Sequence, residues 1–265
     1  MGYRKVIIAS IVGLLLASGG FFLATRTTII TTFFEKVDYF SMYQNLSNPY
    51  IRYVNIPAGL RKEEVADIYS KVLAWNDQDV KDFSEGSEGR YFPSTYVLPL
   101  DASGEEVKDK MLQTFNKKVV GPAVTTTGLS KKKVNMDTAL KVASLIQREA
   151  AGKQDMNLIS GIIWNRIWSG MSLDIDATLQ YAKGNEDKWW PRVLSADKQI
   201  ASPYNTYKTI GLPPTPISNP GLAAIEAAFN PSKTSCIFYF HDDNRMIHCS
   251  KTYAEHKKGV EEYLR

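Results

Sequence analysis

The sequence predicts an α+β fold that follows an N-terminal membrane-spanning helix. Three observations lead to this prediction. An uncharged apolar run stands near the start of the chain, helical spacing of apolar residues fills several later stretches, and two β-prone stretches near the C-terminus have the arrangement of a hairpin. The pattern shows none of the strand–helix–strand alternation that builds a parallel sheet, which leaves a mixed α+β arrangement.

The chain has 265 residues, enough for an anchor and one or two compact domains. Hydrophobic residues make up 44% of it and charged residues 23%, which is ordinary for a globular protein. The formal net charge is only +4, and no segment is densely basic. We therefore expect no nucleic-acid partner.

The apolar run at Val6–Ala24 has 19 residues without a charge, about the length that crosses a bilayer as a helix. Arg4 and Lys5 precede it, so the N-terminus is expected in the cytoplasm and the chain after Arg26 outside. The alternative is a cleaved signal peptide, for which Ala17–Gly19 supplies small residues. The run continues past that point, which favours a retained anchor and a single-pass protein of the cell membrane.

The first part of the exported chain combines strands and helices. Tyr53–Ile56 alternates like a strand, and Tyr91–Val97 is aromatic and β-prone, although Pro93 interrupts it. Arg61–Trp75 and Glu105–Val119 have apolar residues at helical spacing. We expect two strands and two helices here.

A more apolar region follows. One helix is expected from Asp137, whose side chain can cap its start, and a second over Asp155–Trp168, with Gly170 as its stop. Leu173–Pro220 is interpreted as long loops, and Gly221–Phe229 as a short helix. Loops of this length are usually functional or disordered, and the Trp and Tyr residues in this one argue against disorder.

The C-terminal part predicts a hairpin of Thr234–Phe240 and Met246–Ser250, followed by a helix that begins near Thr252. Cys236 and Cys249 fall on the two arms. Whether they pair depends on the strand register, which the sequence leaves open.

Glu149 is the main candidate for acid–base chemistry. It follows Leu145 by four residues and Val142 by seven, which puts it on the apolar side of its helix. A carboxyl group in apolar surroundings resists ionisation, so its pKa rises, as a general acid near neutral pH requires. The alternative is a structural ion pair at the helix end, for example with Arg166.

Asp174 and Asp176 are the nearest other carboxylates in the pattern. An ordinary glycosidase uses two carboxyl groups, and Asp176 is the candidate for the second. It is equally suited to anchor its loop by accepting backbone N–H bonds, which is the favoured interpretation.

Ser202–Tyr207 (SPYNTY) places hydroxyls, an amide and two aromatic rings within six residues. Such groups line polar ligand clefts, and the alternative is a structural turn. No His pair has the helical spacing of a metal site, and neither a phosphate-binding glycine loop nor a nucleophile elbow is present. We expect no metal and no cofactor.

Short motifs follow one another from about Val54 to the end of the chain. They are EGRYFPSTY at Glu88–Tyr96, ASLIQREA at Ala143–Ala150, GIIWNR at Gly161–Arg166, SPYNTY at Ser202–Tyr207 and GLPPTPI at Gly211–Ile217. In this order and spacing they resemble the endolytic murein transglycosylases, the MltG/YceG-like family. The chain departs from that family's usual pattern at Gln147, where a Glu is usual, and at Ala177, where a Pro is usual.

The resemblance implies three parts: a cytoplasmic tip and anchor over 1–26, a small LysM-like module with connecting segments over 27–125, and a catalytic domain with a lysozyme-like helix over 126–265. It also implies cleavage of the β-1,4 bond between N-acetylmuramic acid and N-acetylglucosamine within peptidoglycan strands, leaving 1,6-anhydro ends. Glu149 would be the single acid and base, and a cell-wall synthesis complex is an expected partner.

The same resemblance suggests which side chains bind sugar or hold the cleft. They are Asn165, Asp176, Tyr204, Asn205, Thr206 and Tyr207. Two rival functions stay open: an ordinary hydrolase that uses Asp176 as its second carboxylate, and a non-catalytic glycan-binding protein.

Overall fold

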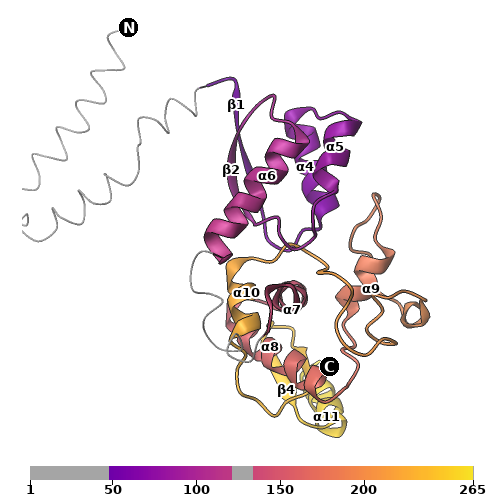
Figure 1. The fold of residues 1–265 in the computed structure, drawn as a ribbon. Helices are drawn as coiled ribbons and strands as arrows, with labels where there is room; N and C mark the ends of the chain where they lie inside the picture. Colours follow the sequence, from indigo (N-terminus) through magenta and orange to yellow (C-terminus); the bar gives the residue numbers. More distant parts are fainter. Residues whose placement is uncertain (1–47, 121–133, 265) are drawn as a thin grey trace, which may run out of the picture. The chain divides into compact units, whose positions relative to one another are not determined.

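The computed structural model describes residues 48–120 and 134–264, and these form a mixed α+β fold (Figure 1). The expected anchor at Val6–Ala24 lies outside the described residues. Within the described ranges, no helix combines the length and apolar character that crossing a membrane requires.

The first hydrophobic core lies beneath a two-stranded sheet of β1 (Ile51–Ile56) and β2 (Ser94–Pro99). Buried and exposed side chains alternate along both strands, as expected for a sheet with one face on a core. The helices α4 (Lys62–Leu73), α5 (Asp77–Ser84) and α6 (Gly104–Phe115) supply most of the other buried side chains. A five-residue π-helix, Asn116–Val120, continues α6.

The second core is built around α7 (Met136–Glu149), in which Val142–Ile146 are all buried. α7 packs against α8 (Lys153–Trp168) and α10 (Leu222–Phe229), and Figure 1 shows the three helices together. Because α7 contributes a continuous buried segment, its C-terminal end is held rigidly in place.

The C-terminal hairpin consists of β3 (Phe238–His241) and β4 (Ile247–Ser250), which pair antiparallel. Cys236 and Cys249 form a disulfide across it, which settles the question that the sequence left open. The final helix α11 (Tyr253–Tyr263) begins where it was predicted and packs on both strands, and the Thr252 side chain caps its start.

The cap of α7 differs from the prediction. The Asn135 side chain, not Asp137, accepts a hydrogen bond from the backbone N–H of Thr138, at 2.8 Å. Asp137 lies in the first turn and forms an ion pair with Arg90. Asn and Asp cap equally well, and the sequence offers both within three residues, so local preference does not choose between them.

Leu173–Pro220 has more regular structure than predicted. It contains α9 (Asp176–Lys183) and a short 3-10 helix, Ser195–Gln199. α9 spans only two turns, with Ala177–Leu179 as its buried residues, so its apolar periodicity is too short to recognise. By contrast, the stop at Gly170 is confirmed, because Gly170 adopts a positive φ of 66° directly after α8.

Asn219 connects the two cores, and each of its backbone and side-chain polar atoms takes part in a hydrogen bond. Its backbone N–H donates to the Leu60 carbonyl and its own carbonyl accepts from the Gly59 N–H, both at 2.8 Å. Its side-chain oxygen accepts from the N–H groups of Gly89 and Tyr91, and its amide donates to Glu88. The 89–91 segment is therefore fixed against the segment that precedes α10.

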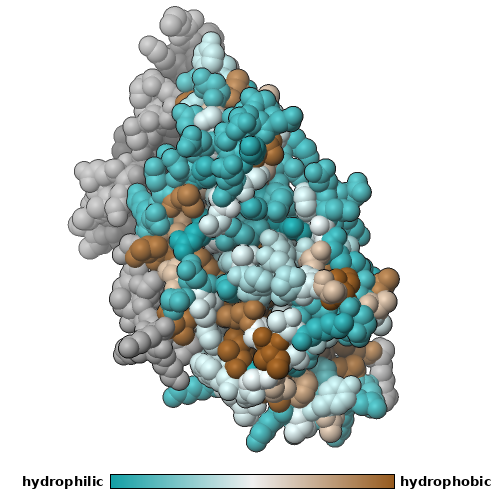
Figure 2. Space-filling view, turned by 45° about the vertical axis from the view of Figure 1, so that its right-hand side comes forward, coloured by the Kyte–Doolittle hydropathy of each residue, from teal (hydrophilic) through white to brown (hydrophobic). Residues whose placement is uncertain are grey.

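The surface in Figure 2 is hydrophilic over most of the face drawn, with hydrophobic side chains in small groups separated by polar ones. The large apolar side chains that the described residues expose include Trp168, Leu194, Ile210 and Met246. They come from different segments of the chain, as is ordinary for a protein surface.

Candidate active site

Glu149 is the last residue of α7 and is half-buried. Its carboxylate oxygen Oε2 accepts a hydrogen bond of 2.7 Å from the Tyr239 hydroxyl on β3. Both side chains line a cavity of about 430 Å³, whose other walls come from the segment before α9, from the hairpin and from α11. A carboxyl group therefore faces a space large enough for part of a ligand.

The pKa of Glu149 lies above its ordinary value. Burial is the main cause, the hydrogen bond from Tyr239 acts in the opposite direction, and the nearby carboxylate of Asp176 raises the pKa further. His241 and Arg148 lower it by smaller amounts. The outcome is a carboxyl group that holds its proton to a higher pH than a solvated glutamate does, which suits a general acid.

Arg166 does not neutralise Glu149. Its guanidinium forms an ion pair with Asp174 at 3.1 Å. It also donates to the carbonyls of Leu173 at 2.8 Å and of Ile237 at 2.6 Å. Arg166 thus ties the segment before α9 to the start of the hairpin, and both segments line the cavity.

A second contact holds the C-terminal end of β3. The His241 ring nitrogen Nε2 lies 3.1 Å from the buried carboxylate of Asp155, near the start of α8. The same Asp155 oxygen accepts from the N–H of Ala151, two residues after Glu149. β3 is therefore fixed to α8 and to the end of α7 on both sides of Tyr239.

Asp176 and Tyr207 are brought together beside Glu149. The Tyr207 hydroxyl donates to Asp176 at 2.6 Å, and the Lys198 ammonium lies 4.5 Å from the centre of the Tyr207 ring. Asp176 is exposed at the first position of α9, so its carboxylate is reachable from solvent. This pair forms a polar edge next to the cavity.

Asn205 and Thr206 lie inside the protein. The Asn205 amide donates to the carbonyls of Lys198 and Ile200, and its oxygen accepts from the Tyr207 N–H. The Thr206 hydroxyl accepts from the N–H of Ile175 at 3.1 Å. Both side chains are buried and occupied with these bonds, so they hold the 198–207 segment against the start of α9.

The remaining two predicted residues lie in different places. Asn165 on α8 donates to the carbonyls of Thr234 and Cys236, which positions the segment before β3. The Tyr204 hydroxyl bonds to Thr215, and its ring packs on Tyr181 with centroids 4.9 Å apart. Tyr204 faces another cavity, away from Glu149.

In the described parts of the chain, no group of three or more His, Cys, Asp or Glu side chains has the arrangement of a metal site. The histidines of the hairpin instead bond individually to carboxylates, His241 to Asp155 and His248 to Asp242.

Comparison with known protein families identifies the family of this chain. The model of the YceG-like family matches residues 32–262. The chain belongs to the YceG-like family. The match includes both cores and the whole of the Glu149 cavity.

Known proteins of this family resemble the chain over most of its length. An endolytic murein transglycosylase of Bacillus subtilis is 37% identical over 190 residues, which is 71% of this chain and 51% of that protein. One of Streptococcus pneumoniae (strain D39) is 30% identical over 67% of this chain and 32% of that protein. The YceG-like chain thus spans about half of the first relative and a third of the second.

A solved structure agrees with the fold. A putative yceG-like protein of Listeria monocytogenes superposes with a TM-score of 0.66 at 28% identity, covering 78% of this chain and 75% of that one. The α+β arrangement described above is therefore that of a YceG-like protein.

Sequence reasoning missed Tyr239, Arg166 and Asp155 as parts of the site of this YceG-like chain. Tyr239 lies 90 residues after Glu149, and its only local signal is its place in a β-prone stretch. Arg166 was considered only as a partner for Glu149, whereas it bonds to Asp174 and to backbone carbonyls. These contacts depend on how the hairpin docks on α7 and α8.

Proposed function

We propose that this chain is an endolytic murein transglycosylase, which cleaves the β-1,4 bond between N-acetylmuramic acid and N-acetylglucosamine within peptidoglycan strands. The observation that carries the proposal is the half-buried Glu149 carboxyl, with its raised pKa, in a cavity at the end of α7. The proposal is supported by relatives that bear this name.

In the first step Glu149 acts as a general acid. It gives its proton to the glycosidic oxygen, and the bond between that oxygen and the anomeric carbon of the muramic acid breaks. The departing N-acetylglucosamine leaves with a free hydroxyl group. Because burial favours the protonated carboxyl group, the proton is available near neutral pH.

In the second step the Glu149 carboxylate acts as a general base. It takes the proton from the 6-hydroxyl of the muramic acid, whose oxygen forms a new bond to the anomeric carbon. The product is a 1,6-anhydro ring, Glu149 regains its proton, and no water is consumed. One carboxyl group suffices because the substrate supplies the nucleophile.

Tyr239 is proposed as a positioning residue. Its hydroxyl donates a hydrogen bond to Oε2 of Glu149, so Oε1 is the oxygen that exchanges the proton with the substrate. The disulfide, Arg166 and the contact of His241 with Asp155 hold the strand on which Tyr239 stands. The carboxyl group is thus oriented before substrate arrives, and such preorganisation is what catalytic groups require.

A hydrolase with Asp176 as its second carboxylate is the rival proposal. Three contacts count against it. Asp176 accepts a hydrogen bond from Tyr207, and Asp174, which lines the cavity, accepts from Arg166 and from the Ser172 hydroxyl. Neither carboxylate is placed as an uncommitted base that activates water.

The remaining proposals concern the place of the protein in the cell. We propose that residues 6–24 form a single membrane anchor with the N-terminus in the cytoplasm, since this run is uncharged and follows Arg4 and Lys5. The 27–125 part is proposed as a LysM-like glycan-binding module, and α7 as the counterpart of a lysozyme-like catalytic helix. A cell-wall synthesis complex is the proposed protein partner.

The test is to incubate the full chain and its Glu149→Gln variant with purified peptidoglycan, and to measure product masses. Glu226→Gln, which changes an exposed carboxyl group on α10, is the matched control. We expect anhydro-muramoyl ends from the wild type and the control, and at least a thousandfold lower rate for Glu149→Gln. Products heavier by one water would establish the hydrolase, and glycan binding without cleavage would establish the binding protein.

A further inference from the structure

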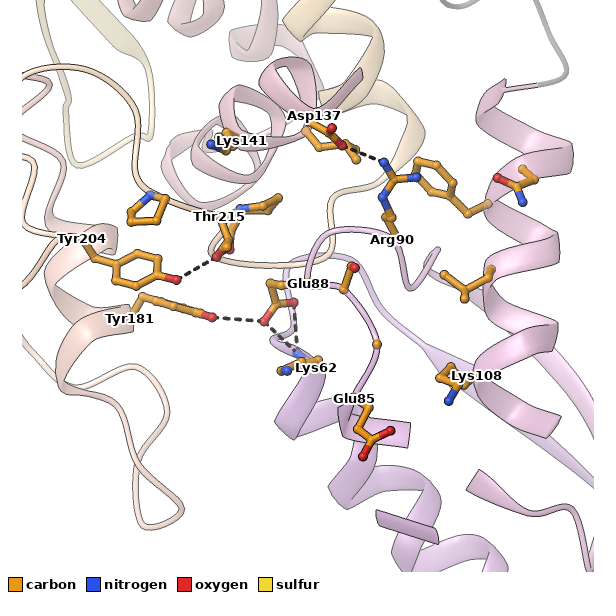
Figure 3. Close-up of a pocket in the computed structure, with 18 residues that line it drawn as sticks. Lys62, Glu85, Glu88, Arg90, Lys108, Asp137, Lys141, Tyr181, Tyr204 and Thr215 are labelled. Carbon is orange, nitrogen blue, oxygen red and sulfur yellow. Dashed lines mark hydrogen bonds and ion pairs between the residues drawn. The ribbon is translucent and has the colours of Figure 1, made fainter. Parts of the chain in front are cut away.

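A second and larger cavity, of about 1100 Å³, lies between the two cores (Figure 3). Its walls are the segment before β2, α6, the first half of α7, and the loops that carry Tyr204 and Thr215. It shares no lining residue with the Glu149 cavity, so the site described above does not account for it.

Several charged groups in this cavity already have partners. The Lys62 ammonium donates to the Ser84 carbonyl at 2.7 Å, and Arg90 is paired with Asp137. The buried Glu88 carboxyl group accepts from the Lys62 N–H and from the Asn219 amide. These groups belong to the framework of the cavity, and a ligand does not need to neutralise them.

Two charged side chains of opposite sign in this cavity have no partner among the described residues. Within residues 48–120 and 134–264, neither the Lys141 ammonium nor the Glu85 carboxylate has a hydrogen-bond or ion-pair partner. Figure 3 shows Lys141 near one edge and Glu85 near the opposite edge, with Glu88 between them in this view. Such a cavity favours a ligand that carries both a carboxylate and an ammonium group.

One wall of the cavity is stiff and partly apolar. Tyr204 packs on Tyr181, and its hydroxyl bonds to Thr215 at 2.8 Å between two prolines, Pro214 and Pro216. Rings and prolines that are already held in place lose little conformational freedom when a ligand binds. This surface suits small apolar side chains of a peptide.

Helix α7 connects this cavity to the catalytic group. Lys141 and Glu149 are eight residues apart on α7, which is about 12 Å along the helix axis. An extended peptide advances about 3.3 Å per residue, so a chain of about four residues covers that distance. By length, a peptide attached to the sugar at Glu149 can therefore span the distance to Lys141.

We propose that the second cavity binds the stem peptide of peptidoglycan, with a peptide carboxylate on Lys141 and the free amine of the peptide toward Glu85. The inference rests on the proposed function, because it takes the peptide to belong to the strand that Glu149 cuts. It adds a determinant of specificity: strands with intact stem peptides bind better than bare glycan.

The test separates binding from catalysis. The full chain carrying Glu149→Gln is titrated with the pentapeptide L-Ala-γ-D-Glu-L-Lys-D-Ala-D-Ala whose N-terminal amine is acetylated, so that its only free amine is on the lysine, and with the same peptide acetylated on its lysine as well. Lys141→Gln is added to weaken the carboxylate contact, and Glu85→Gln to weaken the amine contact. Lys110→Gln, an exposed change on α6 outside the cavity, is the control.

We expect Lys141→Gln to weaken binding of both peptides about tenfold. Glu85→Gln should weaken only the peptide with a free amine, and Lys110→Gln should weaken neither. Absence of peptide binding, equal affinity in all variants, or displacement of the peptide by peptide-free glycan strands would overturn the inference. Because the titration needs no turnover, its result is independent of whether the wild type yields anhydro products.

Discussion

At the scale of single residues, the proposed mechanism depends on the pair of Glu149 and Tyr239. The hydrogen bond from Tyr239 favours the ionised carboxylate, whereas burial favours the protonated acid, and burial has the larger effect on the pKa of Glu149. In the proposed mechanism Glu149 acts first as an acid and then as a base. An intermediate balance between these opposing influences serves both steps better than either influence alone.

Replacing Tyr239 by Phe should make Glu149 a weaker acid. The variant loses the hydrogen bond that lowers the pKa of Glu149, so this pKa rises further. The general acid then keeps its proton to higher pH, so the alkaline limb of the pH–rate profile shifts to higher pH. We expect the maximal rate to fall about tenfold, since the carboxyl group is also less well oriented.

The measurement is the initial rate of anhydro-muropeptide release from pH 5 to 9. Tyr253→Phe is the matched control, because Tyr253 lines the same cavity and is 66% exposed. An unchanged alkaline limb in Tyr239→Phe would show that Tyr239 has no influence on the acid.

The sequence indicated Glu149 but not its surroundings, and the reason is physical. The apolar spacing around Glu149 is a local property of one helix, and it can be read along the chain. The contact with Tyr239 requires a hairpin to dock on that helix, which local pattern does not encode. For Asn205 the sequence pattern suggested a role that the contacts do not support. A side-chain amide can bind a sugar or backbone carbonyls equally well, and here it donates to the carbonyls of Lys198 and Ile200.

At the scale of elements, the C-terminal hairpin is the most exposed to perturbation. Its strands have only four residues each, and a two-stranded hairpin of that length is marginal by itself. The disulfide between Cys236 and Cys249, with a sequence separation of 13, restricts the unfolded hairpin. Tyr239 pairs with Cys249 in the register, so the bridge lies close to the residue that orients Glu149.

Removing the disulfide should lower the stability of the protein. A bridge that closes a loop of this length contributes about 3 kcal/mol to the free energy of unfolding in the chain-entropy model. We expect the Cys236→Ala and Cys249→Ala double variant to unfold at a lower denaturant concentration, with a similar decrease when the wild type is reduced. Equal unfolding midpoints with and without reductant would contradict this.

The longer a helix is and the more apolar residues it buries, the more accurately its sequence predicts it. α8 was predicted to within two residues, because it spans 16 residues and ends before a glycine of positive φ. α5 was missed because Phe83 is its only fully buried residue, so its sequence shows hardly any apolar periodicity. Short polar helices of this kind form because caps and neighbouring elements hold them, here with Asn76 as the cap.

At the scale of the whole molecule, Glu88 and Asn219 determine how the two cores meet. Glu88 is only 8% exposed, and burial raises its pKa to about 8. A buried carboxyl group with a raised pKa stabilises the folded state while it is protonated. That contribution is complete below the unfolded-state pKa of 4.5 and is lost as pH rises through about 8.

Stability should therefore decrease between pH 5 and pH 8, and Glu88→Gln should flatten the decrease. The amide has the shape of the protonated acid and does not titrate. We expect chemical denaturation at several pH values to show a shallower slope of unfolding free energy against pH in this variant. Glu85→Gln, which removes a neighbouring exposed carboxyl group, should keep the slope of the wild type. Parallel slopes for the wild type and Glu88→Gln would rule out this role of Glu88.

The end of α7 has one more consequence. Helical geometry stops at Glu149, and Ala150 is already extended, with φ −69° and ψ 134°. The aligned peptide dipoles of a helix place partial negative charge at its C-terminal end, where a second negative charge is unfavourable. Beyond the effect of burial, the main chain itself thus resists ionisation of Glu149. Because every residue carries a peptide group, this contribution to the pKa of Glu149 depends on where α7 ends and not on which side chains surround the carboxyl group.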